Sequence, residues 1–182
     1  QTNPVRTSRS TVGTMTELND HLKLLFARAA SLFCRNCGKP VRRDTAESIY
    51  ADAQARAAAA EDPRVYLCFP VTVPKNFKEA EVRKLLESQG YTRVHERNGD
   101  TLEVVQDRFR LGNAERARVM ESLETALRMG RGRVALHVVN DAASSPEEGP
   151  VSVDRWRYST DLHCADCDIH YRDPVPSLFS FN

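Results

Sequence analysis

The chain contains 182 residues, of which 41% are hydrophobic and 28% charged, a composition typical of globular domains rather than disordered chains. Its 26 Lys and Arg residues nearly balance its 25 Asp and Glu residues, so the net charge of +1 provides no general attraction to nucleic acid or anionic membranes. No apolar run approaches the roughly 18 residues of a membrane span, and no signal sequence is recognisable at the start. Because the first residue is Gln1 and the first methionine is Met15, we expect a segment of a longer, cytoplasmic protein.

The first third of the chain has the pattern of two helices. After a polar, basic lead-in, Thr14 and Glu17 have the spacing of a capping box, which predicts that a helix begins at Thr14. Apolar residues on one face continue this helix to about Ala29. A second helix is predicted from Asp44 through an alanine-rich stretch, and the Asp-Pro pair at 62–63 ends it.

The central part alternates strand and helix patterns. Strands are predicted over 65–73, 91–96, 101–109, 133–139 and 153–159, helices over 76–89 and 114–129, and a solvated loop over 141–150. Asn98-Gly99-Asp100 joins two of the strands and is a strong hairpin signal. The order within 64–139 is the split βαβ pattern. We therefore predict an α+β fold with a β-α-β-β-α-β-like insertion domain on a helical, zinc-bearing base.

The cysteines suggest a metal centre. Four of the five form two Cys-x-x-Cys pairs, Cys34 with Cys37 and Cys164 with Cys167, at the two ends of the central block. Without an export signal, this paired spacing favours thiolate ligands over disulfides. Zn²⁺ takes four such ligands in a tetrahedron, and a closed set of four is structural rather than catalytic. Cys68 lies in an apolar run and is predicted to be a core residue.

The sequence leaves open which of these cysteines bind the same zinc ion. All four thiols could bind one zinc ion, or each pair could use partners outside this segment. His163 and His170 flank the second pair and are either ligands, supports for ligands or, as we favour, surface histidines. Because Cys-x-x-Cys pairs also serve thioredoxin-like redox chemistry, an independent redox or metal-dependent enzyme is an alternative. The sequence contains no Walker A, His-Glu-x-x-His or Gly-rich dinucleotide motif, so we expect no catalysis by the segment itself.

A local excess of positive charge surrounds the second hairpin strand and the helix after it. Seven arginines stand against four acidic residues there: Arg108, Arg110, Arg116, Arg118, Arg128, Arg131 and Arg133 against Asp107, Glu115, Glu121 and Glu124. This pattern indicates either a partner-binding surface or a solvated helix face with internal salt bridges. A further hypothesis is direct DNA binding through Arg6, Arg9 and the zinc region. The affinity for DNA would then fall steeply as the salt concentration rises.

Three runs of sequence resemble the UvrA family, the DNA-damage-recognition ATPase subunits of the bacterial excinuclease. They are SRSTVGTMTELNDHLKLLFARA with CRNCGKP, then EVVQDRF with ESLETALRMGRGRV, and finally LHCADCDIHYRDPVPSLFSFN. The runs STVGT, SLETAL and LFSFN are the most specific parts of the match, and the three runs together span nearly the whole chain.

The resemblance implies three parts: residues 1–43 with the end of the Q-loop and the first part of signature domain I, residues 44–159 as the UvrB-binding domain, and residues 160–182 as the return into signature domain I. It further implies that Gln1 senses a nucleotide and its Mg²⁺, and that the parent is an ABC-type ATPase that binds DNA as a dimer in nucleotide excision repair, away from any membrane. ATP and Mg²⁺ would be cofactors of that parent, and zinc a structural cofactor of this segment.

The family pattern also implies that Arg93 and Arg108 pair with acidic groups on UvrB, so that the segment recruits UvrB to damaged DNA. Neighbouring hairpin strands would carry the two guanidinium groups, which contact carboxylates in a bidentate manner that lysine cannot reproduce. The tight turn at Gly99 and the acidic loop near 145 depart from the common pattern. A segment of a divergent UvrA paralogue that binds another protein or DNA is therefore an alternative.

Overall fold

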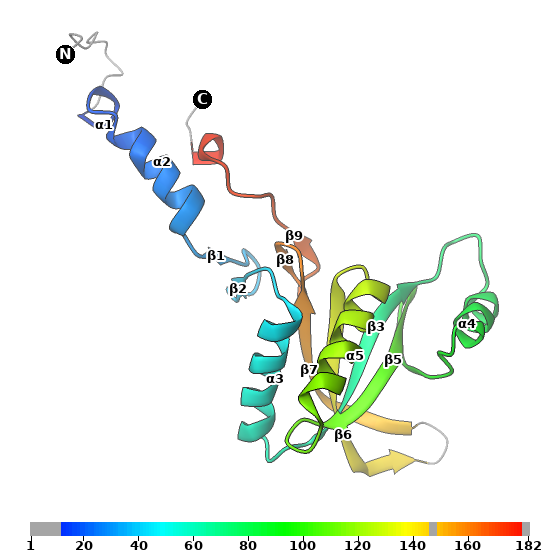
Figure 1. The fold of residues 1–182 in the computed structure, drawn as a ribbon. Helices are drawn as coiled ribbons and strands as arrows, with labels where there is room; N and C mark the ends of the chain where they lie inside the picture. The colour runs from blue at the N-terminus through cyan, green and yellow to red at the C-terminus, as the bar shows by residue number, and fades with distance from the viewer. Residues whose placement is uncertain (1–11, 146–148, 180–182) are drawn as a thin grey trace.

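The computed structural model describes residues 12–145 and 149–179 (Figure 1). The predictions for Gln1, Arg6 and Arg9 lie outside the described residues. The predicted α+β fold class is confirmed. In chain order the elements are α1 (Val12–Met15), α2 (Leu18–Ala29), β1 (Leu32–Phe33), β2 (Pro40–Val41), α3 (Ala46–Ala59), β3 (Arg64–Thr72), α4 (Glu79–Ser88), β4 (Val94–Asn98), β5 (Thr101–Arg110), α5 (Arg116–Met129), β6 (Arg133–Ser145), β7 (Gly149–Ser159), β8 (His163–Cys164), β9 (Ile169–His170) and η1 (Pro176–Phe179).

A five-stranded antiparallel sheet organises the central part of the chain. Its strand order is β4-β5-β3-β6-β7, and each strand runs antiparallel to its neighbours. Strand β5 lies between β3 and β4, which are therefore parallel to each other, as a split βαβ unit requires. The predicted order of elements over 64–139 is thus confirmed, and β7 extends the sheet beyond β6.

One face of the sheet carries the main hydrophobic core. Side chains alternate along β3, so Val65, Leu67 and Phe69 point to this face and are fully buried. Helices α3 and α5 cover it, with Ile49 and Leu123 among the fully buried contacts (Figure 1). This continuous cluster fixes the positions of the strands in the five-stranded sheet.

The opposite face of the sheet is curled and polar. Cys68 is fully buried there, which confirms its prediction as a core residue, and His137 beside it is equally buried. Although β4 and β7 are the two outer strands, Arg155 of β7 donates to the carboxylate of Glu96 of β4. The ring of His95 meets the ring of His137 edge-on at a centroid distance of 4.5 Å. The two edges of the sheet therefore approach each other across this face.

The chain enters and leaves the sheet domain at one place. The N–H of Asp44 donates to the carbonyl of Ser159 at 2.8 Å, and the Asp44 carboxylate accepts from the N–H of Ser159 at 3.3 Å. Outside this point, the hairpin of β1 with β2 and the hairpin of β8 with β9 form a small base, which lies above the sheet domain in Figure 1.

The helix predicted to begin at Thr14 is interrupted instead. The backbone of Glu17 has a φ of 60°, which breaks the helix between α1 and α2. The N–H and the hydroxyl of Thr16 both donate to the carbonyl of Val12, at 3.0 and 2.7 Å, so the turn of α1 is closed just before Glu17. The predicted capping box at Thr14 is therefore wrong.

The solvated loop predicted over 141–150 is also largely wrong. Strand β6 continues to Ser145, and β7 already begins at Gly149, with these two residues paired. Antiparallel pairing forms hydrogen bonds between main-chain groups and does not depend on the side chains. Small and acidic residues can therefore extend a hairpin that begins in the core. In the described ranges, no helix combines the length and apolar character needed to cross a membrane.

A four-cysteine site at the base of the sheet domain

Four thiols from the two ends of the sheet domain meet in the base. The Sγ atoms of Cys34, Cys37, Cys164 and Cys167 all lie within 4.8 Å of one another, and the Cys37 and Cys164 sulfurs are 3.6 Å apart. Sulfurs around a tetrahedral zinc ion stand about 3.8 Å apart, given a Zn–S bond of about 2.3 Å. All five cysteines are free thiols. The donor set and its spacing fit a zinc ion shared by both pairs, which was the simpler of the two sequence-based alternatives.

Local turns explain this convergence. In the first pair, the N–H of Gly38 donates to the carbonyl of Cys34, and the N–H of Cys34 donates to the carbonyl of Lys39. Gly38 has a φ of 70°, a left-handed conformation that glycine adopts without strain. These bonds fold the chain back so that both thiols of the pair point to one side, where the second pair faces them.

The thiols of the site differ in pKa because their surroundings differ. A hydrogen bond with the Tyr171 hydroxyl lowers the pKa of Cys34 to about 6, so Cys34 is a thiolate at neutral pH. Burial raises the pKa of Cys164, which favours its neutral form before a metal binds. Metal ligands must be deprotonated, so the Cys34 thiolate is the natural first ligand, and the other thiols would release protons as the ion binds.

The two flanking histidines have different surroundings. His163 is buried, which contradicts its expected place on the surface, and its Nε2 lies 2.8 Å from the Asp168 carboxylate. His170 is exposed, as favoured, and pairs with His163 across the short β8–β9 ladder. Arg133, at the start of β6, contacts both Asp168 at 3.1 Å and the ring of His170 at 2.7 Å. The guanidinium group therefore occupies the position between these side chains.

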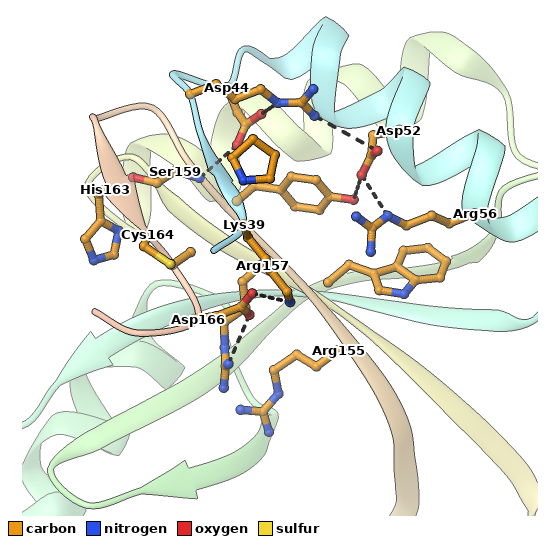
Figure 2. Close-up of a pocket in the computed structure, with 15 residues that line it drawn as sticks. Lys39, Asp44, Asp52, Arg56, Arg155, Arg157, Ser159, His163, Cys164 and Asp166 are labelled. Carbon is orange, nitrogen blue, oxygen red and sulfur yellow. Dashed lines mark hydrogen bonds and ion pairs between the residues drawn. The ribbon is translucent and has the colours of Figure 1, made fainter. Parts of the chain in front are cut away.

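Ion pairs also connect the base to the sheet on the other side. The Asp166 carboxylate, inside the second Cys-x-x-Cys turn, accepts from Lys39 at 2.6 Å and lies 3.5 Å from Arg157 of β7 (Figure 2). Asn36 donates to the sulfur of Cys167 at 3.3 Å. The sequence analysis missed these supporting residues, although the aspartates that alternate with the second pair were a visible signal.

The two arginines singled out by resemblance lie on neighbouring strands. The carbonyl of Arg93, just before β4, accepts from the N–H of Val105 in β5, and Arg108 follows three residues later. Both side chains are exposed. The Arg108 guanidinium lies 5.8 Å from the ring centre of Tyr66, and among the described residues neither arginine is paired with a carboxylate.

Several of the other arginines in the predicted positive surface are engaged within the chain. Arg118 makes a bidentate contact to Asp107, at 2.7 and 3.1 Å, and thereby lowers the pKa of that carboxyl despite its partial burial. Arg110 donates to the carbonyl of Asp62, and Arg133 is held by the base as described. For these residues the alternative of internal pairing is correct.

The fold and the site define a class of protein. An α+β domain stands in the sequence between two Cys-x-x-Cys pairs, and the four thiols meet in a site that fits a tetrahedral metal ion. A family model described as the UvrA interaction domain matches residues 94–140, from β4 through most of β6. Curated proteins match almost the entire chain. UvrABC system protein A of Xanthomonas axonopodis pv. citri is 33% identical over 96% of this chain, that of Mycobacterium tuberculosis 32% over 97%, and that of Streptomyces coelicolor 31% over 97%.

These comparisons confirm the resemblance to the UvrA family. Over nearly its whole length, the chain is related to one segment of UvrABC system protein A. The chain spans about a fifth of the length of these curated relatives, with 18% of the Xanthomonas protein and 19% of the Mycobacterium protein covered.

Proposed function

We propose that this chain is the partner-binding segment of a UvrA-type nucleotide excision repair protein, and that it recruits UvrB. The observation that carries the proposal is the position of the UvrA interaction domain match, which covers the hairpin of β4 with β5, helix α5 and most of β6. Arg93 and Arg108 lie on or beside this hairpin, exposed and without a carboxylate partner among the described residues. Two such guanidinium groups are suited to acidic side chains of a partner protein.

The unit that binds UvrB is residues 44–159. Support for these bounds comes from the double contact between Asp44 and Ser159, which brings the two ends of the unit together. Residues 1–43 and 160–182 would then belong to the body of the parent protein. Gln1 would sense the nucleotide there, and ATP, Mg²⁺, DNA and the dimer partner would bind elsewhere in the parent.

A structural zinc ion would hold the base of this unit. Its ligands would be Cys34, Cys37, Cys164 and Cys167, whose spacing fits a closed tetrahedral set. A closed set leaves no open position for a substrate, so the ion would stabilise the base and supply no chemistry.

Binding of purified UvrB to the chain tests the proposal. The variants Arg93→Ala and Arg108→Ala should each lose about 2–5 kcal/mol of binding free energy, or about 30-fold or more in affinity, because a carboxylate of the partner loses its counter-charge. Arg128→Ala is the matched control, since Arg128 is an exposed arginine of α5 whose side chain donates to Thr125 and pairs with no carboxylate among the described residues.

Calorimetric titration provides the affinities, and circular dichroism verifies that each variant keeps its fold. Full affinity in both the Arg93 and the Arg108 variants would contradict the assignment of the interface. Loss of affinity in the Arg128 variant as well would indicate general charge attraction rather than two specific contacts.

A further inference from the structure

A groove runs along the outer edge of β7, beside the four-cysteine base. It encloses about 390 Å³, within the range of about 300–1,000 Å³ typical of ligand pockets. Strand β7 forms its floor, β2 and the side of α3 that carries Asp52 and Arg56 form one wall, and the turn after β8 forms the other (Figure 2). Neither the sequence motifs nor the proposed UvrB contact accounts for this groove.

The main chain of β7 presents unpaired groups to the groove. Among the described strands, β7 pairs with β6 alone, so no strand covers its other edge. On that edge the N–H of Arg155 is bonded to the Asp154 carboxylate at 2.7 Å. At Ser159, both main-chain groups point away from β6 and bond with Asp44. Outward-pointing groups recur every second residue in an antiparallel strand, and the pairing of β7 with β6 is regular from Asp154 to Ser159. The N–H and C=O of Arg157 therefore also point outward, and no described residue bonds to them.

Positive charge predominates among the side chains that line the groove. Its cations are Lys39, Arg42, Arg56, Arg155 and Arg157, and its carboxylates are Asp44, Asp52 and Asp166. Some of these cations share a carboxylate and others have one of their own. Asp166 lies 2.6 Å from Lys39 and 3.5 Å from Arg157, and Asp52 lies 2.8 Å from Arg56 and 4.0 Å from Arg42. Arg42 also lies 3.0 Å from Asp44, and Arg155 pairs with Glu96 of β4. The guanidinium groups therefore retain donors for additional oxygen atoms.

Asp44 shows how an acidic residue satisfies this edge. Its N–H binds the carbonyl of Ser159, while its carboxylate binds the N–H of the same residue. One acidic residue thus forms hydrogen bonds with both the N–H and the C=O that point outward at one position of β7. The next outward position along the edge is Arg157, which faces the groove.

We propose that this groove binds an acidic, extended peptide segment of a partner protein, which adds as a strand to the edge of β7. Main-chain hydrogen bonds to Arg157 would provide the pairing, and the cations of the two walls would select acidic side chains. The site is separate from the proposed UvrB contact, because Arg93 lies just before β4 and Arg108 lies on β5, and neither residue lines the groove. The inference therefore does not depend on the proposed function.

Trp156 offers a direct measurement. It is the only tryptophan of the chain, lines the groove, and lies 5.7 Å from the guanidinium of Arg56. The probe is the capped pentapeptide Glu-Val-Glu-Val-Glu, titrated against the 182-residue chain while tryptophan fluorescence is recorded. We expect a saturable change with this peptide, and at least about tenfold weaker binding of Lys-Val-Lys-Val-Lys.

Two variants locate the binding site. Arg157→Gln and Arg42→Gln should each weaken binding of the acidic peptide by about tenfold, because each removes a charged donor of the groove. Arg83→Gln is the control, since Arg83 is an exposed arginine paired with Glu79 on α4, away from the groove. Arg93→Ala should leave peptide binding unchanged, which separates this inference from the proposed UvrB contact.

A modified peptide tests strand addition without any change to the protein. The same acidic peptide, methylated at every main-chain nitrogen, should lose binding because it cannot donate to the carbonyl of Arg157. Equal binding of the methylated peptide, with displacement by inorganic phosphate, would overturn strand addition and leave a simple anion site. Absence of saturable binding by the acidic peptide, or equal binding of the lysine peptide, would overturn the proposal altogether.

Discussion

The sheet domain and the base of this chain are stabilised in different ways. In the sheet domain, side chains from β3, β5, β6, α3 and α5 form one continuous buried cluster. The cluster of the base has three buried residues, Cys34, Val41 and Cys164, with partly buried residues such as Leu32 and Ile169 packed around them. Two of the three buried residues are thiols of the four-cysteine site. Helix α2 above it has no buried residue, and its apolar residues Leu25 and Phe26 are more than half exposed.

This difference indicates that apolar packing alone stabilises the sheet domain but not the base. Burial of apolar area stabilises the sheet domain, as in any small domain. The base instead depends on a few ion pairs and on four thiols that fit a metal ion. Loss of the thiols should therefore affect the base far more than the sheet, and loss of a core side chain should do the reverse.

The largest expected effect follows from removal of two thiols. The double variant Cys34→Ser/Cys164→Ser should lose zinc binding, and the hairpins of the base should lose their order, because binding of structural zinc contributes about 10–16 kcal/mol to the folding of small zinc sites. Metal analysis and amide hydrogen exchange measure the two effects, and protection should persist in β3 and β6.

Cys68→Ala is the control, since Cys68 is a buried cysteine of β3 in a separate cluster and is not one of the four grouped thiols. Chelation of zinc from the unmodified chain should reproduce the effect of the double variant. Zinc bound as tightly by the double variant as by the unmodified chain would contradict the four-thiol site.

A core substitution should have the next largest effect. Phe69→Ala removes a fully buried ring from β3 and should lower the free energy of unfolding by about 3–5 kcal/mol. Leu25→Ser, on the exposed face of α2, should change it by less than about 0.5 kcal/mol. Urea denaturation of the zinc-loaded chain measures both values. Comparable destabilisation by the two substitutions would show that α2 is packed against the rest of the chain in solution.

The smallest effect concerns pH. Burial lowers the pKa of His137 to about 3, and neither ring nitrogen has a hydrogen-bond partner among the described residues. The unfolded chain would protonate this residue near pH 6.5, so the unfolded state binds more protons between about pH 3 and 6.5. The contribution of His137 should therefore decrease stability by up to about 1.4 kcal/mol for each pH unit below 6.5.

His137→Leu removes this contribution. The stability of the variant relative to the original chain should increase as the pH is lowered from 6.5 to 4.5, as measured by urea denaturation at a series of pH values. His95, Arg155 and Arg157 surround the same face and are retained in both chains, so they cancel in the difference. Parallel pH profiles for the two chains would show that His137 is not neutral and buried in solution.

The sequence predicted the sheet domain well because its signals are local and strong. The apolar run of β3, the Asn-Gly turn between β4 and β5, and the amphipathic pattern of α5 each specify one element with little competition. The meeting of the two Cys-x-x-Cys pairs was one of two alternatives, since spacing within a pair does not report the distance between pairs. Only the closing of the sheet domain brings residues 37 and 164 together.

Other features depend on contacts that a sequence pattern does not contain. The helix breaks at Glu17, whose backbone is left-handed, although the capping-box spacing pointed to a helix that begins at Thr14. His163 in β8 is buried where His170 of β9 pairs with it and Asp168 contacts its ring. The groove beside β7 depends on which strand becomes the outer one, and β7 takes that place only because β6 pairs with β3 on its other side.

The contact between Asp44 and Ser159 has a consequence for protein engineering. These residues are 115 positions apart in sequence, yet their main chains are joined by a hydrogen bond of 2.8 Å. A short turn could replace everything between them without stretching the chain, and the four-thiol base would keep both of its halves. Conversely, the excised unit could be grafted into another host at any pair of adjacent surface positions. The same junction would also allow one such unit to be exchanged for another during evolution, with little disturbance to the body that carries it.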